Sequence, residues 1–361
     1  MPRPSASSRA SYTIIGAVTS QRPTRVGFVG INPRSQRLLL PGLTASPRAD
    51  LAAVCSRDSA KAEQSATALG PEVQPFTSVA AMAHSGAIDA IYINTPVATH
   101  YDICLTAIRA GCAVICEKPL AANTTEAQEL QQAAAEAGVR HVVNFTYRSM
   151  PGYRLTERLL CQGGLGRPVH AEFAQLQGHD FRPDYPARSA LLESGVHLYD
   201  TILGLTQLAG FGFPSEVCAA PMEATNGLDH GWAFTLRMST DAIVSAAFSR
   251  RSLGWNNGYR WSLYGDEAAL VVELDSDRTD ARTVQRGDEQ HEGVWRPVAV
   301  PADLQADDNR FPTYHMDRMV AAVRGEEPYP GFTEAVATHQ LADAIASSAS
   351  SGSWETVAKG A

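Results

Sequence analysis

Several features that the sequence lacks narrow the class of protein. None of its six cysteines is spaced as C-x-x-C, and several lie in apolar runs, so we expect a reduced, cytoplasmic protein with no structural zinc or other metal. There is no run of Lys and Arg, and the formal net charge is -8, whereas a nucleic-acid-binding protein usually has a basic face. No apolar stretch reaches the roughly 18 residues that a membrane helix needs. We therefore expect neither a nucleic acid nor a membrane as a partner.

The length and composition indicate an ordinary globular protein with two domains. The chain has 361 residues, of which 44% are hydrophobic and 19% are charged. Residues 1–24 are rich in Ser, Arg, Pro and Thr and do not form a secretory signal pattern. We expect them to be a flexible N-terminal extension.

A strand, a tight turn and a helix follow this extension. Residues 25–30 are apolar and end in glycine, and an apolar-periodic run begins after the turn, which is where a dinucleotide pyrophosphate meets a helix N-terminus. The G-x-G-x-x-G fingerprint is incomplete, because Asn32 and Ser35 fill its second and third positions. Asn tolerates a left-handed backbone, and the Ser35 hydroxyl could bond a phosphate. The candidate pyrophosphate-binding residues are Gly30, Asn32, Pro33, Arg34 and Ser35.

The turn after the second strand, residues 50–55, bears on the choice between NAD and NADP. An NAD-binding strand usually ends on Asp or Glu, which bonds the ribose 2′-OH, whereas a nearby Arg suits a 2′-phosphate. Ser56 and Arg57 follow the strand here, which favours NADP, although Asp58 keeps NAD open. The alternative is that Arg57 is a solvated surface charge.

Two further strands end in residues that are typical of a site. Residues 88–93 run into Asn-Thr-Pro at 94–96, and residues 114–116 run into Glu-Lys-Pro at 117–119. Open α/β folds bind ligands at the carboxyl ends of their strands, so both triplets are candidates; the alternative is a charge pair in water. His100 begins the next helix, and it either caps that helix or faces a cofactor.

Strands and helices alternate up to residue 148, and the pattern then changes. The alternation predicts βαβ units in a doubly wound parallel sheet, which is a Rossmann domain over residues 25–148. Long strand-like segments with few helices follow. They predict an α+β domain with a large, open and mostly antiparallel sheet over residues 149–361.

A second group of polar residues lies in a predicted helix of this domain. Glu193, His197 and Asp200 are spaced four and three apart, so on one helix they would share a face. A carboxylate beside an imidazole raises the pKa of the imidazole, which suits proton transfer at a carbinol or carbonyl. The alternative is an ordinary ion pair beside a buried histidine.

Two loops of the second domain combine aromatic and polar residues. Aromatic faces with Asn, Asp and Arg suit a sugar or polyol ring, although they also occur in ordinary loops. The candidate substrate-binding residues are His179, Arg182, Tyr185 and Trp255.

Together these motifs resemble the glucose–fructose oxidoreductase, inositol dehydrogenase and MocA (Gfo/Idh/MocA) family over residues 25–357. The chain departs from the family pattern at Asn32 and at Glu193, where many members have Gly and Asp. The resemblance implies a Rossmann domain followed by a domain with an open sheet, through which we expect a homodimer or homotetramer. It also implies further cofactor contacts from Asn94, Thr95, Pro96, His100, Glu117, Lys118 and Arg148.

The resemblance also implies catalytic roles. Lys118 would bond the substrate oxygen and steady its charge, His197 would be the general acid or base, and Glu193 would orient His197 and reach the substrate. The expected activity is NADP-dependent hydride transfer to or from a carbon of a sugar-like or cyclic alcohol or ketone. Two alternatives remain open: a dinucleotide-bound sensor without catalysis, suggested by the altered glycine turn, and a biosynthetic imine or ketone reductase.

Overall fold

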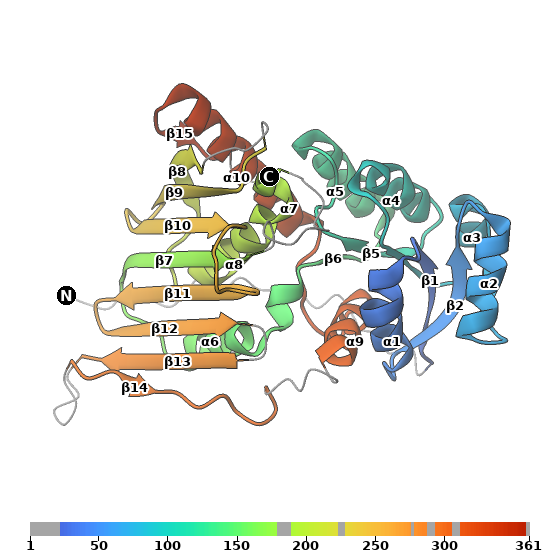
Figure 1. Ribbon diagram of the computed structural model, residues 1–361, viewed down its shortest axis with the longest axis horizontal. Helices are drawn as coiled ribbons and strands as arrows, with labels where there is room; N and C mark the ends of the chain where they lie inside the picture. The colour runs from blue at the N-terminus through green and yellow to red at the C-terminus, as the bar shows by residue number, and fades with distance from the viewer. Residues whose placement is uncertain are drawn as a thin grey trace.

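The computed structural model describes residues 22–178, 189–222, 228–275, 278–286, 293–304 and 311–358. Its strands form two sheets that lie side by side (Figure 1). The first is a six-stranded sheet in the order β3-β2-β1-β4-β5-β6, and all its neighbouring strands pair in parallel. This confirms the predicted Rossmann sheet. Its strands are β1 (Thr24–Val29), β2 (Ala49–Cys55), β3 (Gln74–Phe76), β4 (Ala90–Ile93), β5 (Ala113–Glu117) and β6 (His141–Asn144).

Helices connect these strands and cover both faces, which is why β4 is apolar and buried throughout its length. They are η1 (Ser35–Leu39), α1 (Leu40–Thr44), α2 (Ser59–Leu69), α3 (Val79–His84), η2 (Val97–Thr99), α4 (His100–Arg109) and α5 (Thr124–Ala137). The strand order reverses between β1 and β4, and open α/β folds bind ligands at such a point. The residues that follow β1, β4 and β5 therefore meet at one edge of the sheet.

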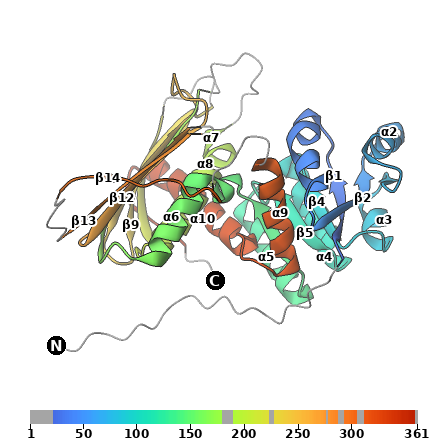
Figure 2. The same ribbon diagram turned by 90° about the horizontal axis from the view of Figure 1, so that it is seen from below.

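One helix from the C-terminal part of the chain returns to this domain. Helix α9 (Phe311–Arg324) packs beside α1, and its Met316, Met319 and Val320 share a core with Val26 and Phe28 of β1 (Figure 2). The predicted division at residue 148 would assign α9 to the second domain. Burial of its apolar face instead makes α9 part of the nucleotide-domain core.

The second sheet has nine strands in the order β14-β13-β12-β11-β7-β10-β9-β8-β15. Strands β7 and β10 pair in parallel and the other pairs are antiparallel, which confirms the prediction of an open, mostly antiparallel sheet. The strands are β7 (Pro168–Leu176), β8 (Pro214–Pro221), β9 (Gly231–Met238), β10 (Ile243–Ser249), β11 (Gly258–Gly265), β12 (Ala268–Asp275), β13 (Arg278–Gln285), β14 (Arg296–Pro297) and β15 (Glu355–Thr356).

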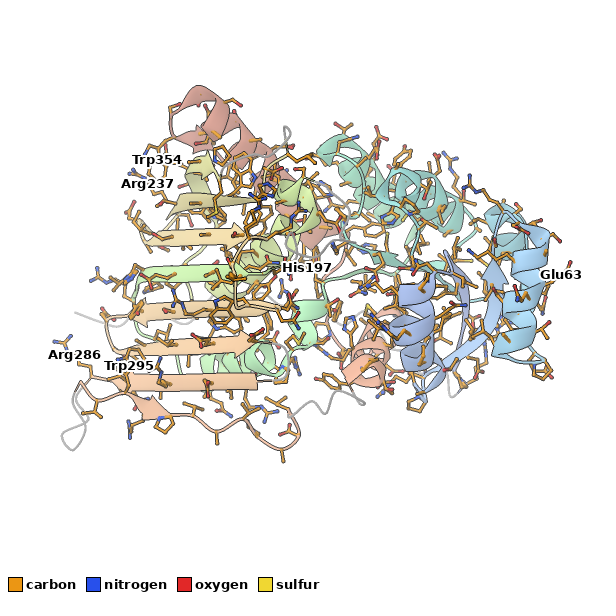
Figure 3. All side chains as sticks on the ribbon, in the orientation of Figure 1. Glu63, His197, Arg237, Arg286, Trp295 and Trp354 are labelled. Atoms are coloured by element: carbon orange, nitrogen blue, oxygen red, sulfur yellow. The ribbon has the colours of Figure 1, made fainter. Side chains whose placement is uncertain are left out.

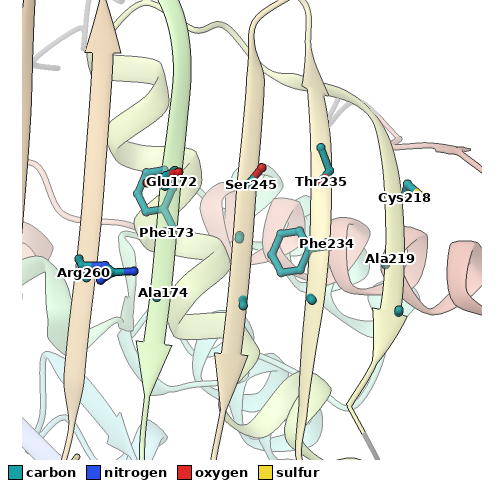
Figure 4. A pocket seen from close by; sticks show the side chains of 13 residues that line it. Glu172, Phe173, Ala174, Cys218, Ala219, Phe234, Thr235, Ser245 and Arg260 are labelled. Atoms are coloured by element: carbon teal, nitrogen blue, oxygen red, sulfur yellow. The ribbon is translucent and has the colours of Figure 1, made fainter. Parts of the chain in front are cut away.

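Among the described residues, helices cover one face of this sheet and none covers the other (Figure 2). They are α6 (Pro151–Gln162), α7 (Ala190–Glu193), α8 (Gly195–Leu208) and α10 (Phe332–Ser351), and η3 (Thr146–Ser149) leads into α6. The opposite face carries a shallow hollow of about 520 Å³ that extends from β11 across β7, β10 and β9 to β8 (Figure 4). Small side chains such as Ala174, Ala233 and Ala247 line it, with Glu172 and Arg260 at its side. In the described part of the chain, no helix is both long enough and apolar enough to span a membrane.

Candidate active site

Lys118 stands where the two domains meet. Strand β5 ends at Glu117, and the Lys118–Pro119 peptide bond is cis. The Lys118 Nζ atom donates a hydrogen bond of 2.7 Å to the main-chain oxygen of Glu193 and lies 3.4 Å from its Oε1. The structure thus brings together two predicted catalytic residues that are 75 positions apart.

The predicted helix around Glu193 is interrupted. Helix α7 ends at Glu193 and α8 begins at Gly195, with Ser194 between them. The prediction that Glu193, His197 and Asp200 lie on one continuous helix is therefore wrong, because only His197 and Asp200 belong to α8. The Glu193 carboxylate lies toward Lys118, while Asp200 is buried and pairs with Arg148.

His197 lies between the two sheets (Figure 3), partly buried, with the Tyr147 ring edge-on at 4.9 Å between centroids. Its Nδ1 is inaccessible and has no hydrogen-bond partner among the described residues. Burial of the ring nitrogens, and then the positive charges of Lys118 and Arg34, hold the pKa of His197 well below its ordinary value. The predicted upward shift is wrong, because burial, followed by the nearby positive charges, lowers the pKa of His197. His197 is therefore a neutral imidazole that can accept a proton.

Arg148 and Asp200 form a buried ion pair. Arg148 Nε lies 2.7 Å from Asp200 Oδ2, and Nη2 lies 2.8 Å from Oδ1. The guanidinium also lies over the Tyr153 ring, 5.0 Å from its centroid. Arg148 was predicted to bind the cofactor, but its guanidinium pairs with Asp200 and so links η3 to α8.

The turn after β1 is closed by its own hydrogen bonds. Gly30 has a φ of +95°, and a Cβ there would collide with the main-chain oxygen of Asn94, so the turn requires glycine. Ser35 is fully buried, and its hydroxyl accepts from Asn32 N and donates to Asn32 O, both at 2.9 Å. The expectation that this hydroxyl bonds a phosphate is therefore corrected, because the turn already uses it. Asn32, Pro33 and Arg34 are exposed at the tip.

Asn94, Thr95 and Pro96 follow β4 and lie against this turn. Asn94 Nδ2 donates to Gly30 O at 2.7 Å. His100 is 1% exposed, and its ring nitrogens lie 2.8 Å from Thr95 O and 2.8 Å from Pro119 O. Thr99, not His100, occupies the N-cap of α4. His100 thus does not cap the helix; its buried ring links the loops that follow β4 and β5.

The turn after β2 leaves one cation exposed. Ser56 N donates to Phe76 O at 3.0 Å, which anchors the turn, and Arg57 is exposed beside it. The Asp58 carboxylate accepts from Lys61 N at 3.1 Å and so caps α2. Asp58, the residue that left NAD possible as the cofactor, is therefore already engaged in capping α2.

Glu117 was predicted to bind the cofactor, but the residue is 5% exposed and its carboxylate is turned inward. Its Oε1 accepts from Tyr92 OH at 2.9 Å and from Asn144 Nδ2 at 2.8 Å, and Arg34 Nη1 lies 3.6 Å away. The Glu117 carboxylate therefore has a structural role in the site, in which it accepts hydrogen bonds from buried groups of β4 and β6.

A polar cluster near His197 was missed in the sequence. Asn257 Oδ1 accepts from Tyr147 OH at 2.5 Å and from Gln177 Nε2 at 2.7 Å. The Tyr147 ring also packs on Tyr259, with centroids 4.0 Å apart. Asn257 stands two residues after Trp255, so the aromatic and polar composition of that loop was the available signal.

The predicted substrate residues have mixed outcomes. The Trp255 ring covers Gly258, where a Cβ would collide with it, and remains partly exposed. His179, Arg182 and Tyr185 lie outside the described residues. In the described part of the chain, Tyr147 links the two groups, since its ring contacts His197 and its hydroxyl donates to Asn257.

A glycine turn at the switch point of a parallel sheet, with a lysine and a histidine from two domains beside it, is typical of dinucleotide-dependent oxidoreductases. Over residues 24–145 the chain matches the family model described as an oxidoreductase family with an NAD-binding Rossmann fold. It is 31% identical over 267 residues to a dTDP-3,4-didehydro-2,6-dideoxy-alpha-D-glucose 3-reductase of Streptomyces violaceoruber, covering 72% of this chain and 75% of that relative. The chain belongs to the Gfo/Idh/MocA family of oxidoreductases, as predicted.

A more distant relative and a solved structure are also similar to the chain. The chain is 23% identical over 316 residues to levoglucosan dehydrogenase of Pseudarthrobacter phenanthrenivorans, covering 75% of this chain and 80% of the relative. A solved structure of levoglucosan dehydrogenase in complex with NADH matches it with a TM-score of 0.81 at 22% identity. That match covers 94% of this chain and 100% of the other, and it supports the fold.

Proposed function

We propose that the protein is an NADP-dependent oxidoreductase that transfers a hydride between the nicotinamide and a carbon of a sugar-like or cyclic alcohol or ketone. The observation that carries this proposal is the convergence of Lys118, from the end of β5, with Glu193 and His197 of the second domain. The named relatives act on carbohydrate derivatives, which supports the substrate class.

The edge of the first sheet fits a nicotinamide dinucleotide. The turn at Gly30 packs closely against Asn94 at the switch point, and its tip residues Asn32, Pro33 and Arg34 are accessible to a ligand. The exposed Arg57 would hold a 2′-phosphate, together with Ser56, because Asp58 is engaged in capping α2. Asn94, Thr95 and Pro96 would border the nicotinamide ribose. Bound NADP supplies the hydride acceptor, and NADPH the donor.

The residues of this chain would handle the proton and the substrate oxygen. An ammonium has three N–H donors, and two of those on Lys118 are directed at Glu193, which leaves one for a substrate hydroxyl or carbonyl. His197 is neutral and would accept the hydroxyl proton during oxidation and return it during reduction. Glu193 would hold Lys118 in place. The Asn257, Tyr147 and Gln177 cluster would meet further substrate hydroxyls.

We also propose a homodimer or homotetramer formed through the uncovered face of the nine-stranded sheet. That face carries the shallow hollow with small side chains, which would allow close approach of a second layer (Figure 4). All six cysteines are free thiols, which fits the cytoplasm that we propose as the compartment. Light scattering on the wild type and on Ala247→Arg would test the interface: a smaller mass for the variant supports it.

The experiment that tests the function has two stages. The protein is first titrated with NADPH and NADH, and a tenfold preference for NADPH, about 1.4 kcal/mol, is expected. Turnover is then measured on a panel of sugars, polyols, ketones and imines, with Lys118→Ala and His197→Ala as variants. Unchanged turnover in both variants would contradict the assigned roles, and turnover of imines alone would favour the biosynthetic reductase. Tight NADPH binding without any turnover would favour the alternative of a non-catalytic sensor. That alternative is suggested by the turn at Asn32, whose side chain accepts a hydrogen bond from Ser35 N within the turn itself.

A further inference from the structure

A continuous hydrogen-bonded chain runs from α9 to the residue before Lys118. His315 of α9 is 3% exposed, and its Nδ1 lies 2.9 Å from Ser149 Oγ. Its Nε2 lies 2.8 Å from Asn144 Oδ1 at the end of β6. Asn144 Nδ2 in turn donates to Glu117 Oε1 at 2.8 Å and to Tyr92 OH at 2.9 Å. This series of hydrogen bonds therefore links α9, in the last third of the sequence, to the end of β5.

The donors and acceptors in this chain fit in one direction. The Glu117 carboxylate can only accept, so Asn144 must direct its NH₂ group toward Glu117 and its carbonyl toward His315. His315 Nε2 must then carry the proton and donate it, while Nδ1 accepts from the Ser149 hydroxyl. Burial, with Arg318 and Arg34 nearby, lowers the pKa of His315 to about 3, which is consistent with one neutral tautomer.

These hydrogen bonds hold the Glu117 carboxylate in its inward position. Glu117 lies beside the half-exposed Arg34, which belongs to the glycine turn and could draw the carboxylate outward. The Asn144 amide and the Tyr92 hydroxyl oppose that movement because both donate to the same carboxylate oxygen. Glu117 is bonded directly to Lys118, so a shift of Glu117 would displace the lysine that meets Glu193.

We propose that His315 is a positioning residue for Lys118, acting by orienting the Asn144 amide that holds Glu117. The catalytic part of this inference rests on the proposed function of Lys118. His315 touches neither substrate nor cofactor in this role. A purely structural alternative is that His315 only packs α9 onto the first sheet.

Two nearly isosteric variants separate these roles. The amide nitrogen of Gln matches His Nε2, so His315→Gln keeps the donor to Asn144 and loses the contact with Ser149. The amide of Asn matches His Nδ1, so His315→Asn keeps the contact with Ser149 and loses the donor to Asn144. His339→Asn, which replaces another buried histidine on α10, is the control for the general cost of such a change.

The expected result is a fall in kcat of at least about tenfold for His315→Asn, with the KM for NADPH within about twofold of wild type. His315→Gln should retain kcat within about threefold, and His339→Asn should leave it unchanged. A purely structural role would lower the melting temperature of both His315 variants alike and leave kcat per folded molecule the same. That outcome would overturn the proposal.

A second readout does not require catalysis. Hydrogen exchange in the cofactor-free protein should be faster in residues 115–121 of His315→Asn than in wild type or His315→Gln. If the wild type turns over nothing, the proposed function has failed, and exchange alone then decides whether His315 positions this turn. Equal exchange in the two variants would refute the positioning role.

Discussion

The shorter of the two contacts between Lys118 and Glu193 is with the main chain. Lys118 Nζ lies 2.7 Å from the Glu193 carbonyl oxygen but 3.4 Å from the carboxylate oxygen Oε1. A substitution at position 193 can remove the second contact but leaves the first. The structure therefore separates the role of the ammonium from that of the carboxylate.

We predict that Lys118→Met lowers kcat/KM by at least about 100-fold, because it removes the donor to the substrate oxygen. Glu193→Gln should cost less than about tenfold, because the carbonyl still holds Lys118 and the amide still accepts a hydrogen bond. Steady-state kinetics with the best substrate of the panel tests both values. Equal losses in the two variants would show that the Glu193 carboxylate takes part in the chemistry itself.

The exposed Arg57 should decide between the two nicotinamide dinucleotides. We predict that Arg57→Ala weakens NADPH binding by about tenfold or more and leaves NADH binding unchanged, because only NADPH carries a 2′-phosphate. Lys61→Ala, a loss of positive charge on the exposed side of α2, is the control. Equal weakening by both variants would mean that Arg57 contributes only to the general positive potential. Calorimetric titration of the wild type and both variants with each dinucleotide gives the six affinities.

The lowered pKa of His197 predicts an unusual pH profile. A histidine with an ordinary pKa near 6.5 would become protonated, and inactive as a base, as the pH falls from 8 to 6. In the free enzyme His197 stays neutral over this interval, so kcat/KM for alcohol oxidation should remain level down to about pH 6. An acid limb near 6.5 that disappears in His197→Gln would contradict the prediction.

Acid should destabilise the protein through His315. Its pKa is lowered to about 3 in the folded state, so below pH 6.5 the unfolded chain binds the proton that the folded chain refuses. The stabilisation is thus complete above pH 6.5 and is lost as the pH falls toward 3. At pH 5 His315 alone should cost about 2 kcal/mol of the free energy of unfolding.

Urea unfolding of wild type and His315→Gln at pH 7 and pH 5 measures this cost. The variant should lose less stability between the two pH values, because glutamine does not titrate. His84→Gln, at an exposed position on α3, is the control and should behave as wild type. The same pH loss in His315→Gln as in wild type would assign the effect to other groups.

The buried pair of Arg148 and Asp200 should matter for stability more than for cofactor binding. Asp200→Asn leaves a buried guanidinium without its counter-charge, and we predict a loss of about 3–5 kcal/mol in the free energy of unfolding. NADPH affinity of the folded protein should be unchanged. Asp303→Asn, in the exposed pair with Arg158, is the control and should change little. A selective loss of NADPH affinity would restore Arg148 to the cofactor site.

The local patterns of the sequence predicted most of the architecture. Alternating apolar strands and helices indicate the Rossmann sheet, and the residues that end β1, β4 and β5 must meet at one edge because parallel strands share a direction. Gly30, Asn94 and Lys118 were found in this way. Strands β13, β14 and β15 were not predicted, since their sequences are largely polar and lack a strong alternating pattern.

The interruption at Ser194 could not be read from spacing. Four-residue and three-residue intervals predict one helical face only if the helix is continuous, and the tertiary contact of Glu193 with Lys118 accompanies a break there. The predicted direction of the pKa shift of His197 was wrong for a related reason. It depends on burial and on the charges of Lys118 and Arg34, which only the folded chain brings near.

The sequence by itself determined the two sheets and the sheet edge at which Gly30, Asn94 and Lys118 meet, because strand periodicity and turn chemistry are local properties. Only the tertiary structure decided how these groups are held. It placed His315 of α9 against Asn144, 171 residues away, and joined Asp200 to Arg148 in the interior. Those contacts form because buried polar groups must find partners wherever the chain can supply them, and no local pattern encodes which partner that will be.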